Sequence, residues 1–258
     1  MNVDNGPDYD WTSLWNMLPQ KAQADLVNPT AKAIGDGLGG IFTWIFHKPI
    51  EYQAVERAKV ESLKHMVAEK ISKIPESKMT FKNRGLILKA LEDSKYSLDS
   101  EELREYFASL IANAANKDKA YNISPYFSTI LSNLSVQDAL FLKKFESHGS
   151  IKDSIGIMRV NIFQNSKNTE FNTVQKDLVL VSEVQLTSYS EQMDTLESLG
   201  ILKRIYGKYS LSVKPQLKRG EDIIMHAYPS FSREQLKIEN GNVELTELGK
   251  SFANIVLL

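Results

Sequence analysis

Histidines and paired carboxylates are the residues in this sequence whose types could support metal or acid–base chemistry. The chain has four histidines: His47, His65, His148 and His226. None has a second histidine or a carboxylate at the spacing of a metal-binding motif. In the stretch "SEELRE", Glu101 and Glu105 would share one helix face, and paired carboxylates can transfer protons. Acidic residues in a first helical turn more often interact with the helix dipole, so we predict no catalytic and no metal-binding residue.

The short motifs of common enzyme classes are also missing from the sequence. There is no P-loop, no G-x-G-x-x-G after a strand, no G-x-S-x-G and no H-E-x-x-H. The stretch "GDGLGG" lacks the lysine and the preceding strand of a phosphate-binding loop. Without cysteine, the chain has no disulfide and no thiolate metal site, which fits a reducing cytosol. We therefore expect a protein that is not an enzyme and that uses no cofactor and no small-molecule substrate.

A glycine-containing apolar stretch, "AKAIGDGLGGIFTWIFHKP" at residues 31–49, is the first candidate for a binding surface. On a helix its small residues form a ridge that allows close approach of another helix. The favoured interpretation is an internal helix of a helical domain, and the alternatives are an association surface or membrane insertion after a trigger. Asp36 opposes the membrane interpretation, because charge in a bilayer is costly. The candidate association or membrane residues are Ala31, Gly35, Leu38, Gly39, Ile41, Phe42, Ile45 and Phe46.

A basic segment near the C-terminus is the second candidate. It contains six cations without an acidic residue: Lys203, Arg204, Lys208, Lys214, Lys218 and Arg219. These could contact phosphate or an acidic protein, and the favoured interpretation is a solvated or structural segment. The helix expected at residues 188–199 carries Glu191, Asp194 and Glu197. Three negative charges suit the major groove poorly, and the net charge of −1 adds no general attraction to nucleic acid.

The elements that would position these residues fall into two parts. Apolar residues at helical spacing recur from Val60 to Leu134, and those between Leu103 and Ala114 form one buried stripe. The expected helix caps are Asp99 or Ser100, then Ser124, then Ser135, where "SVQD" is a weak capping-box pattern. We predict an N-terminal extension at 1–27, an α-helical domain at 28–149 and a winged-helix-like α/β domain at 150–258, in a mainly α-helical protein. The acidic start "MNVDNGPDYDW" is unlike a secretory leader, and no run is long enough for a membrane span. We expect a cytoplasmic protein, with peripheral membrane binding as the alternative.

The winged-helix prediction for the second domain depends on local patterns. Met158, Val160 and Ile162 alternate with polar residues, as in a strand. A helix that stops at Gly200 precedes another strand, and Asn240-Gly241 between short β-type runs predicts a hairpin. Thr246 is expected to cap a final helix.

Two long stretches carry a resemblance to a known family. They are "NPTAKAIGDGLGGIFTWIFHKPIEY" and "SEELREYFASLIANAANKDKAYNISPYFSTILSNLSVQDALFLKKF", and "ELTELGKSF" at 244–252 adds to them. The shared elements are Glu102-Leu103-Arg104, Phe107, Leu110, Pro125-Tyr126-Phe127 and Leu134-Ser135. These residues resemble the Abi-alpha family of bacterial proteins associated with abortive phage infection, over residues 28–146 and, less closely, the tail. Tyr126 departs from the small polar residue expected there.

The resemblance implies a role in antiphage defence and supplies no catalytic residue. The favoured hypothesis is a non-enzymatic defence protein that acts through protein contacts or self-association. The alternatives are a membrane-acting effector that uses residues 31–47, or a winged-helix nucleic-acid binder that uses residues 203–219.

Overall fold

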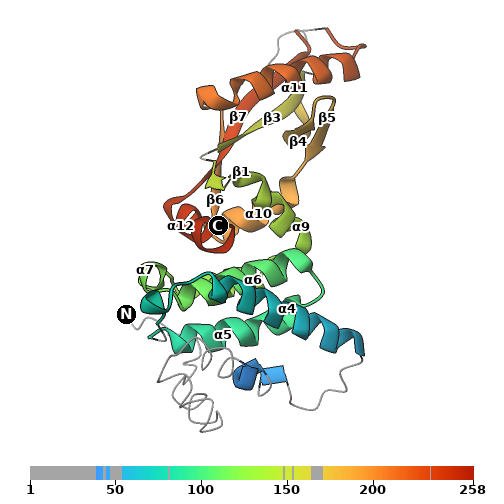
Figure 1. Ribbon diagram of the computed structural model, residues 1–258. Helices are drawn as coiled ribbons and strands as arrows, with labels where there is room; N and C mark the ends of the chain where they lie inside the picture. The colour runs from blue at the N-terminus through green and yellow to red at the C-terminus, as the bar shows by residue number, and fades with distance from the viewer. Residues whose placement is uncertain are drawn as a thin grey trace, which may run out of the picture. The chain divides into compact units, whose positions relative to one another are not determined.

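The computed structural model describes residues 39–42, 45–46, 54–80, 82–147, 149–152, 154–163, 171–232 and 234–258 (Figure 1). Contacts within the chain divide it into two compact units, Met1–Asn133 and Leu134–Leu258. The described part of the first unit is mostly helical, and the second unit combines helices with a five-stranded antiparallel sheet. The fold class is therefore mixed α/β, and the expectation of a mainly α-helical protein is wrong because this sheet is the framework of the whole second unit.

Helix α6 (Glu101–Ala114) is central to the first unit. It contacts four other helices: α4 (Ala54–Ser72), α5 (Arg84–Ser94), α7 (Lys117–Ala120) and α8 (Tyr126–Ser132). The Ser100 hydroxyl accepts a hydrogen bond from the Leu103 amide at 3.2 Å, and this cap satisfies a free N–H group at the helix start. The predicted apolar stripe is buried: Leu103, Tyr106, Phe107, Leu110, Ile111 and Ala114. The described part of this unit also contains the short helices η1 (Glu76–Lys78) and η2 (Lys95–Ser97), and residues 39–42 and 45–46 are helical.

The second unit begins with helix α9 (Val136–Leu142), which has the predicted capping box. The Ser135 hydroxyl accepts from the Asp138 amide at 3.2 Å, and the Asp138 carboxylate accepts from the Ser135 amide at 2.8 Å. The predicted first domain ends at residue 149, whereas contacts within the chain place the division between Asn133 and Leu134. The reason is that α9 packs on α10 (Ser190–Ser198). Helix η3 (Lys143–Phe145) and the hairpin of β1 (Glu146–Ser147) and β2 (Ser150–Ile151) follow α9.

The main sheet of the second unit has the strand order β5-β4-β3-β7-β6, with every neighbouring pair antiparallel. Its strands are β3 (Ser154–Phe163), β4 (Phe171–Ser182), β5 (Gln185–Ser188), β6 (Leu202–Tyr206) and β7 (Leu236–Leu245). The remaining helices of the unit are α10, η4 (Leu211–Val213), α11 (Lys214–Ala227) and α12 (Glu247–Val256). Thr246 caps α12 as predicted, and Gly200, with φ 72°, ends the α10 segment before β6.

Helix α11 packs across one face of the sheet (Figure 1). Two glycines allow its close approach: a Cβ at Gly156 would lie 3.1 Å from the Leu217 side chain, and a Cβ at Gly220 would lie 2.2 Å from the Met158 methyl carbon. The core beneath α11 contains Met158, Val160, Leu178, Val213, Leu217, Ile224 and Leu236.

The predicted hairpin at Asn240-Gly241 is wrong, because both residues lie inside the continuous strand β7. Gly241 pairs with Ile157 of β3 on one side and with Tyr206 of β6 on the other. A Cβ at Gly241 would lie 2.1 Å from the Ile205 carbonyl oxygen, so the glycine permits close contact between two strand backbones. Without this hairpin, the structure does not show the winged-helix arrangement.

Candidate functional site

Four apolar residues of the glycine-containing stretch are buried within the first unit. Ile41, Phe42, Ile45 and Phe46 are each at most 9% exposed, and the rings of Phe42 and Phe46 stack with centroids 5.7 Å apart. An internal helix would bury these side chains in this way. The four side chains are not available at the surface for contact with a partner or a membrane. A Cβ added at Gly39 would meet no atom within 4 Å. Ala31, Gly35 and Leu38 lie outside the described residues.

The six cations of the basic segment do not form one patch. Lys203 and Arg204 lie on β6 at one edge of the sheet, whereas Lys214, Lys218 and Arg219 lie on α11, which contacts β5 at the opposite edge. Three of the six pair with carboxylates. Lys203 lies 3.2 Å from Glu244, Arg219 lies 3.1 Å from Glu183, and Arg204 belongs to a larger ionic cluster. The exposed members without such an ion pair in the described residues are Lys208, Lys214 and Lys218.

Arg204 is the centre of an ionic cluster that joins β6, α10 and β4. Its guanidinium donates to Glu197 at 2.9 Å and to the buried Asp177 at 3.1 Å, and it lies 2.6 Å from Asp194. Burial alone would lower the pKa of Arg204, but these hydrogen bonds and the Asp177 charge raise it above its usual value. Asp194 and Glu197 of α10 thus neutralise a cation of the same unit.

Asp177 is held from several directions at the point where β4 bends. Its carboxylate accepts a hydrogen bond from the Tyr206 hydroxyl at 2.8 Å, and its amide donates to the same hydroxyl oxygen at 3.0 Å. Its carbonyl accepts from the Tyr189 amide at 3.0 Å. The Arg159 guanidinium carbon lies 3.9 Å from the centroid of the Tyr206 ring.

The bend is a β-bulge. Met158 pairs with Leu178 and Val160 with Gln175, so β4 contains one more residue than β3 in this interval. Asp177 has φ 54°, a left-handed conformation that is uncommon outside glycine. Bulges of this kind bend a strand and end regular pairing. Beyond it β3 and β4 run apart (Figure 1), so the ionic cluster fixes the conformation that separates them.

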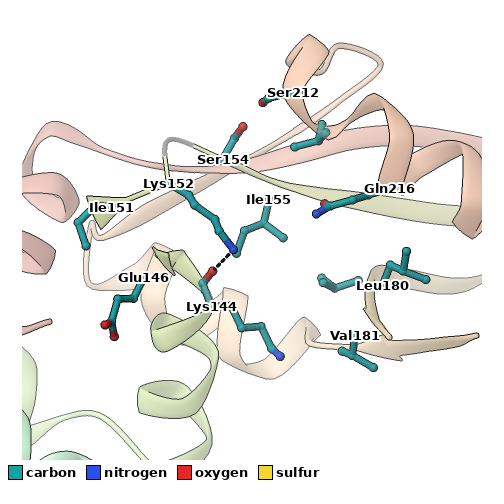
Figure 2. A pocket seen from close by; sticks show the side chains of 12 residues that line it. Lys144, Glu146, Ile151, Lys152, Ser154, Ile155, Leu180, Val181, Ser212 and Gln216 are labelled. Atoms are coloured by element: carbon teal, nitrogen blue, oxygen red, sulfur yellow. Dashed lines mark hydrogen bonds between the residues drawn. The ribbon is translucent and has the colours of Figure 1, made fainter. Parts of the chain in front are cut away.

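A cavity of about 540 Å³ lies where the two strands separate (Figure 2). Four segments of the second unit line it: η3 with the β1–β2 hairpin, the start of β3, the end of β4, and η4 with the first turn of α11. Its volume is in the range of small-molecule pockets. The lining residues are Lys144, Glu146, Ile151, Lys152, Ser154, Ile155, Val179, Leu180, Val181, Ser212, Val213 and Gln216.

Aliphatic side chains and two lysines, Lys144 and Lys152, line this cavity. Lys152 extends across its centre and donates to the Lys144 carbonyl at 3.3 Å (Figure 2). The Lys144 ammonium lies 5.1 Å from the centroid of the Tyr189 ring, a cation–π contact. Glu146 is the one carboxylate among the lining residues. The cavity therefore favours a ligand with apolar groups and negative charge.

The carboxylates of "SEELRE" serve local structure. Glu105 lies 2.6 Å from the Lys70 ammonium, and Glu102 accepts from the Ser100 hydroxyl at 3.2 Å. His65 and His226 are exposed, while His47 and His148 lie outside the described residues. In the described part of the chain, no group of three or more His, Cys, Asp or Glu residues could hold a metal ion. No helix of that part has the length and apolarity to cross a bilayer.

A comparison with protein families covers the part of the chain that contains the ionic cluster and the cavity. The family described as Abortive infection alpha matches residues 55–256, which include α4 to α12 and every residue that lines the cavity. The chain belongs to the abortive infection alpha family. No curated protein and no solved structure matches it. The predicted resemblance is thus confirmed, but the match begins after residues 31–47.

In this member of the abortive infection alpha family, sequence patterns did not point to the cavity residues or to Asp177. Lys144 and Lys152 each occur in an ordinary polar stretch, and four separate segments must meet before they share a cavity. One weak signal exists for the bulge: "QKDLVLV" places Lys176-Asp177 before an apolar strand run. Aspartate tolerates the left-handed conformation better than most residues.

Proposed function

We propose that this protein is an antiphage defence protein of the abortive-infection type that acts by binding another protein rather than by catalysis. Membership of the abortive infection alpha family supports the defence role. The observation that carries the binding role is the cavity between β3 and β4, with its aliphatic walls and the ammonium groups of Lys144 and Lys152. Such a surface recognises a partner through apolar contact and charge.

The proposal can be tested by phage challenge of cells that express the full chain. Expression should reduce plaque formation relative to cells with an empty vector. The double variant Lys144→Glu, Lys152→Glu should lose this protection, because it reverses the charge of the cavity. The matched control is Lys143→Glu, Lys237→Glu, which makes the same charge change at two exposed lysines of the same unit that do not line the cavity.

Each outcome bears on a different part of the proposal. Unreduced plaque formation with the wild-type chain contradicts the defence role. Protection by the cavity variant equal to that of the control contradicts the cavity as the binding site. Fractionation of the same cells tests the alternatives: an accumulation in membranes during infection, or dye release from liposomes by the purified protein, would favour the membrane-acting hypothesis. Salt-sensitive binding to nucleic acid, weakened by charge reversal at Lys208 and Lys218, would favour the nucleic-acid hypothesis.

A further inference from the structure

The walls of the cavity include two strand edges that do not pair with each other. Residues 154–157 of β3 pair with β7, from Ser154–Glu244 to Ile157–Gly241. Val179 and Leu180 of β4 pair with Thr187 and Leu186 of β5. The first pair between β3 and β4 is Met158–Leu178, and no described residue of 154–157 pairs with a described residue of 179–182.

A strand with a neighbour on one side only directs alternate N–H and C=O groups toward the open side. Ser154 and Ile155 of β3 line one wall of the cavity, and residues Val179, Leu180 and Val181 of β4 line another. Proteins that recognise extended peptides use such edges, because main-chain hydrogen bonds supply affinity and side-chain pockets supply specificity. The backbone geometry thus favours an extended peptide over a compact ligand.

The side chains around the edges indicate the composition of that peptide. Ile155, Val179 and Val181 are apolar surfaces that would contact alternate residues of an inserted strand. Lys144 and Lys152 outnumber Glu146 among the charged lining residues. The one hydrogen bond from Lys152 to a lining residue, at 3.3 Å to the Lys144 carbonyl, leaves other ammonium protons for a ligand, since a lysine has three.

We infer that the cavity binds an extended acidic peptide segment of a partner protein, which inserts as a strand between the diverging ends of β3 and β4. This inference rests on the proposed function and names the class of its partner. The bulge at Asp177 holds the two strands apart before the peptide arrives, so the protein does not have to break an existing β3–β4 ladder. Alternating apolar and acidic side chains on the peptide would match the aliphatic walls and the two lysines.

The test uses the purified full chain and two synthetic peptides, one of alternating valine and glutamate and one of alternating valine and lysine. A displayed library of random peptides supplies unbiased probes. We expect the valine–glutamate peptide, and library peptides enriched in acidic residues, to bind, and the valine–lysine peptide not to bind. At a peptide concentration about ten times the Kd, amide hydrogen exchange in residues 154–157 and 179–182 should slow about tenfold.

Variants of the two lysines separate charge recognition from folding. Lys152→Gln should weaken binding about threefold, and Lys144→Glu, Lys152→Glu should weaken it about tenfold or more, consistent with partly exposed charge pairs. The control Lys143→Glu, Lys237→Glu should bind like the wild type. Equal melting temperatures of all variants would show that they remain folded.

Three results would overturn the inference: binding of neither the synthetic nor the library peptides, equal binding of acidic and basic peptides, or binding that leaves amide exchange at the two strand ends unchanged. These results are distinct from failure of the proposed function. Phage protection that depends on Lys144 and Lys152, together with absent peptide binding, would support the proposed function and contradict the peptide as the ligand. Peptide binding without any phage protection would support the peptide site and contradict the defence role.

Discussion

The hydroxyl of Tyr206 offers the sharpest test of how the bulge in β4 is maintained. In the variant Tyr206→Phe, the Asp177 carboxylate loses a donor at 2.8 Å and the Asp177 amide loses its acceptor at 3.0 Å. A hydrogen bond to a charged group contributes about 1.5–3 kcal/mol, and a buried amide left without an acceptor costs about 1–3 kcal/mol. Asp177 is 1% exposed, so water cannot replace both contacts without a local rearrangement.

We therefore expect Tyr206→Phe to lower the free energy of unfolding of the second unit by about 3 kcal/mol. With a urea m-value of about 2 kcal/mol/M, the unfolding midpoint should shift down by about 1.5 M. Urea unfolding followed by circular dichroism measures the shift. Hydrogen exchange in β3 and β4 assigns it to this unit, and exchange should be fastest near Asp177.

The matched control is Tyr209→Phe, which removes a hydroxyl from a tyrosine that is 40% exposed in the same unit. Its free energy of unfolding should change by less than about 0.5 kcal/mol. A Tyr206→Phe variant as stable as this control would refute the reasoning, because Asp177 would then keep its conformation without the tyrosine.

Three further predictions test pH dependence, backbone packing and helix capping. Burial, the hydrogen bond to Asp177 and the Asp177 charge raise the pKa of the Tyr206 hydroxyl above its usual value. A raised folded-state pKa gives stability that is complete below the unfolded pKa of about 10 and is lost as pH rises through the folded pKa. Urea unfolding should therefore show falling stability above about pH 10, with a smaller fall in Tyr206→Phe; equal falls would contradict the coupling. A Cβ at Gly249 would lie 1.8 Å from the Ile201 carbonyl oxygen. Gly249→Ala should therefore lower the free energy of unfolding by about 3 kcal/mol, since the backbone must move to make room. An unchanged urea midpoint would show that the backbone around Gly249 and Ile201 moves at no cost. Ser135→Ala removes the capping box of α9 and should cost about 1 kcal/mol in the same measurement; a cost near zero would mean that packing alone sets this helix start.

Features that depend on neighbours in the sequence were predicted well. The caps at Ser100, Ser135 and Thr246 are present, because a side chain and the amide that it accepts from are a few residues apart. Gly200 ends a helical segment for a similar reason: a single residue supplies the left-handed conformation. The family resemblance also came from such local patterns.

One local prediction is wrong: the N-cap of α8 is Pro125 and not Ser124. The wrong hairpin prediction concerns a segment whose partners are distant in the sequence. Asn240-Gly241 has the composition of a hairpin turn, yet β3 and β6 pair with the two sides of this segment and hold it extended. For Arg204 the favoured interpretation was a solvated or structural segment, and it could not name the partner, Asp177, which is 27 positions away. Neither partner can be recognised before the strand order is known.

The sequence by itself determined where helices α6, α9 and α12 begin, where the α10 segment ends, and to which family the protein belongs, but it did not predict helix α11. The tertiary structure alone decided the strand order, the ionic cluster around Asp177 and the cavity between β3 and β4. The physical reason is range: capping and amphipathic periodicity act over one or two helical turns, whereas strand pairing and burial of Asp177 join segments tens of residues apart.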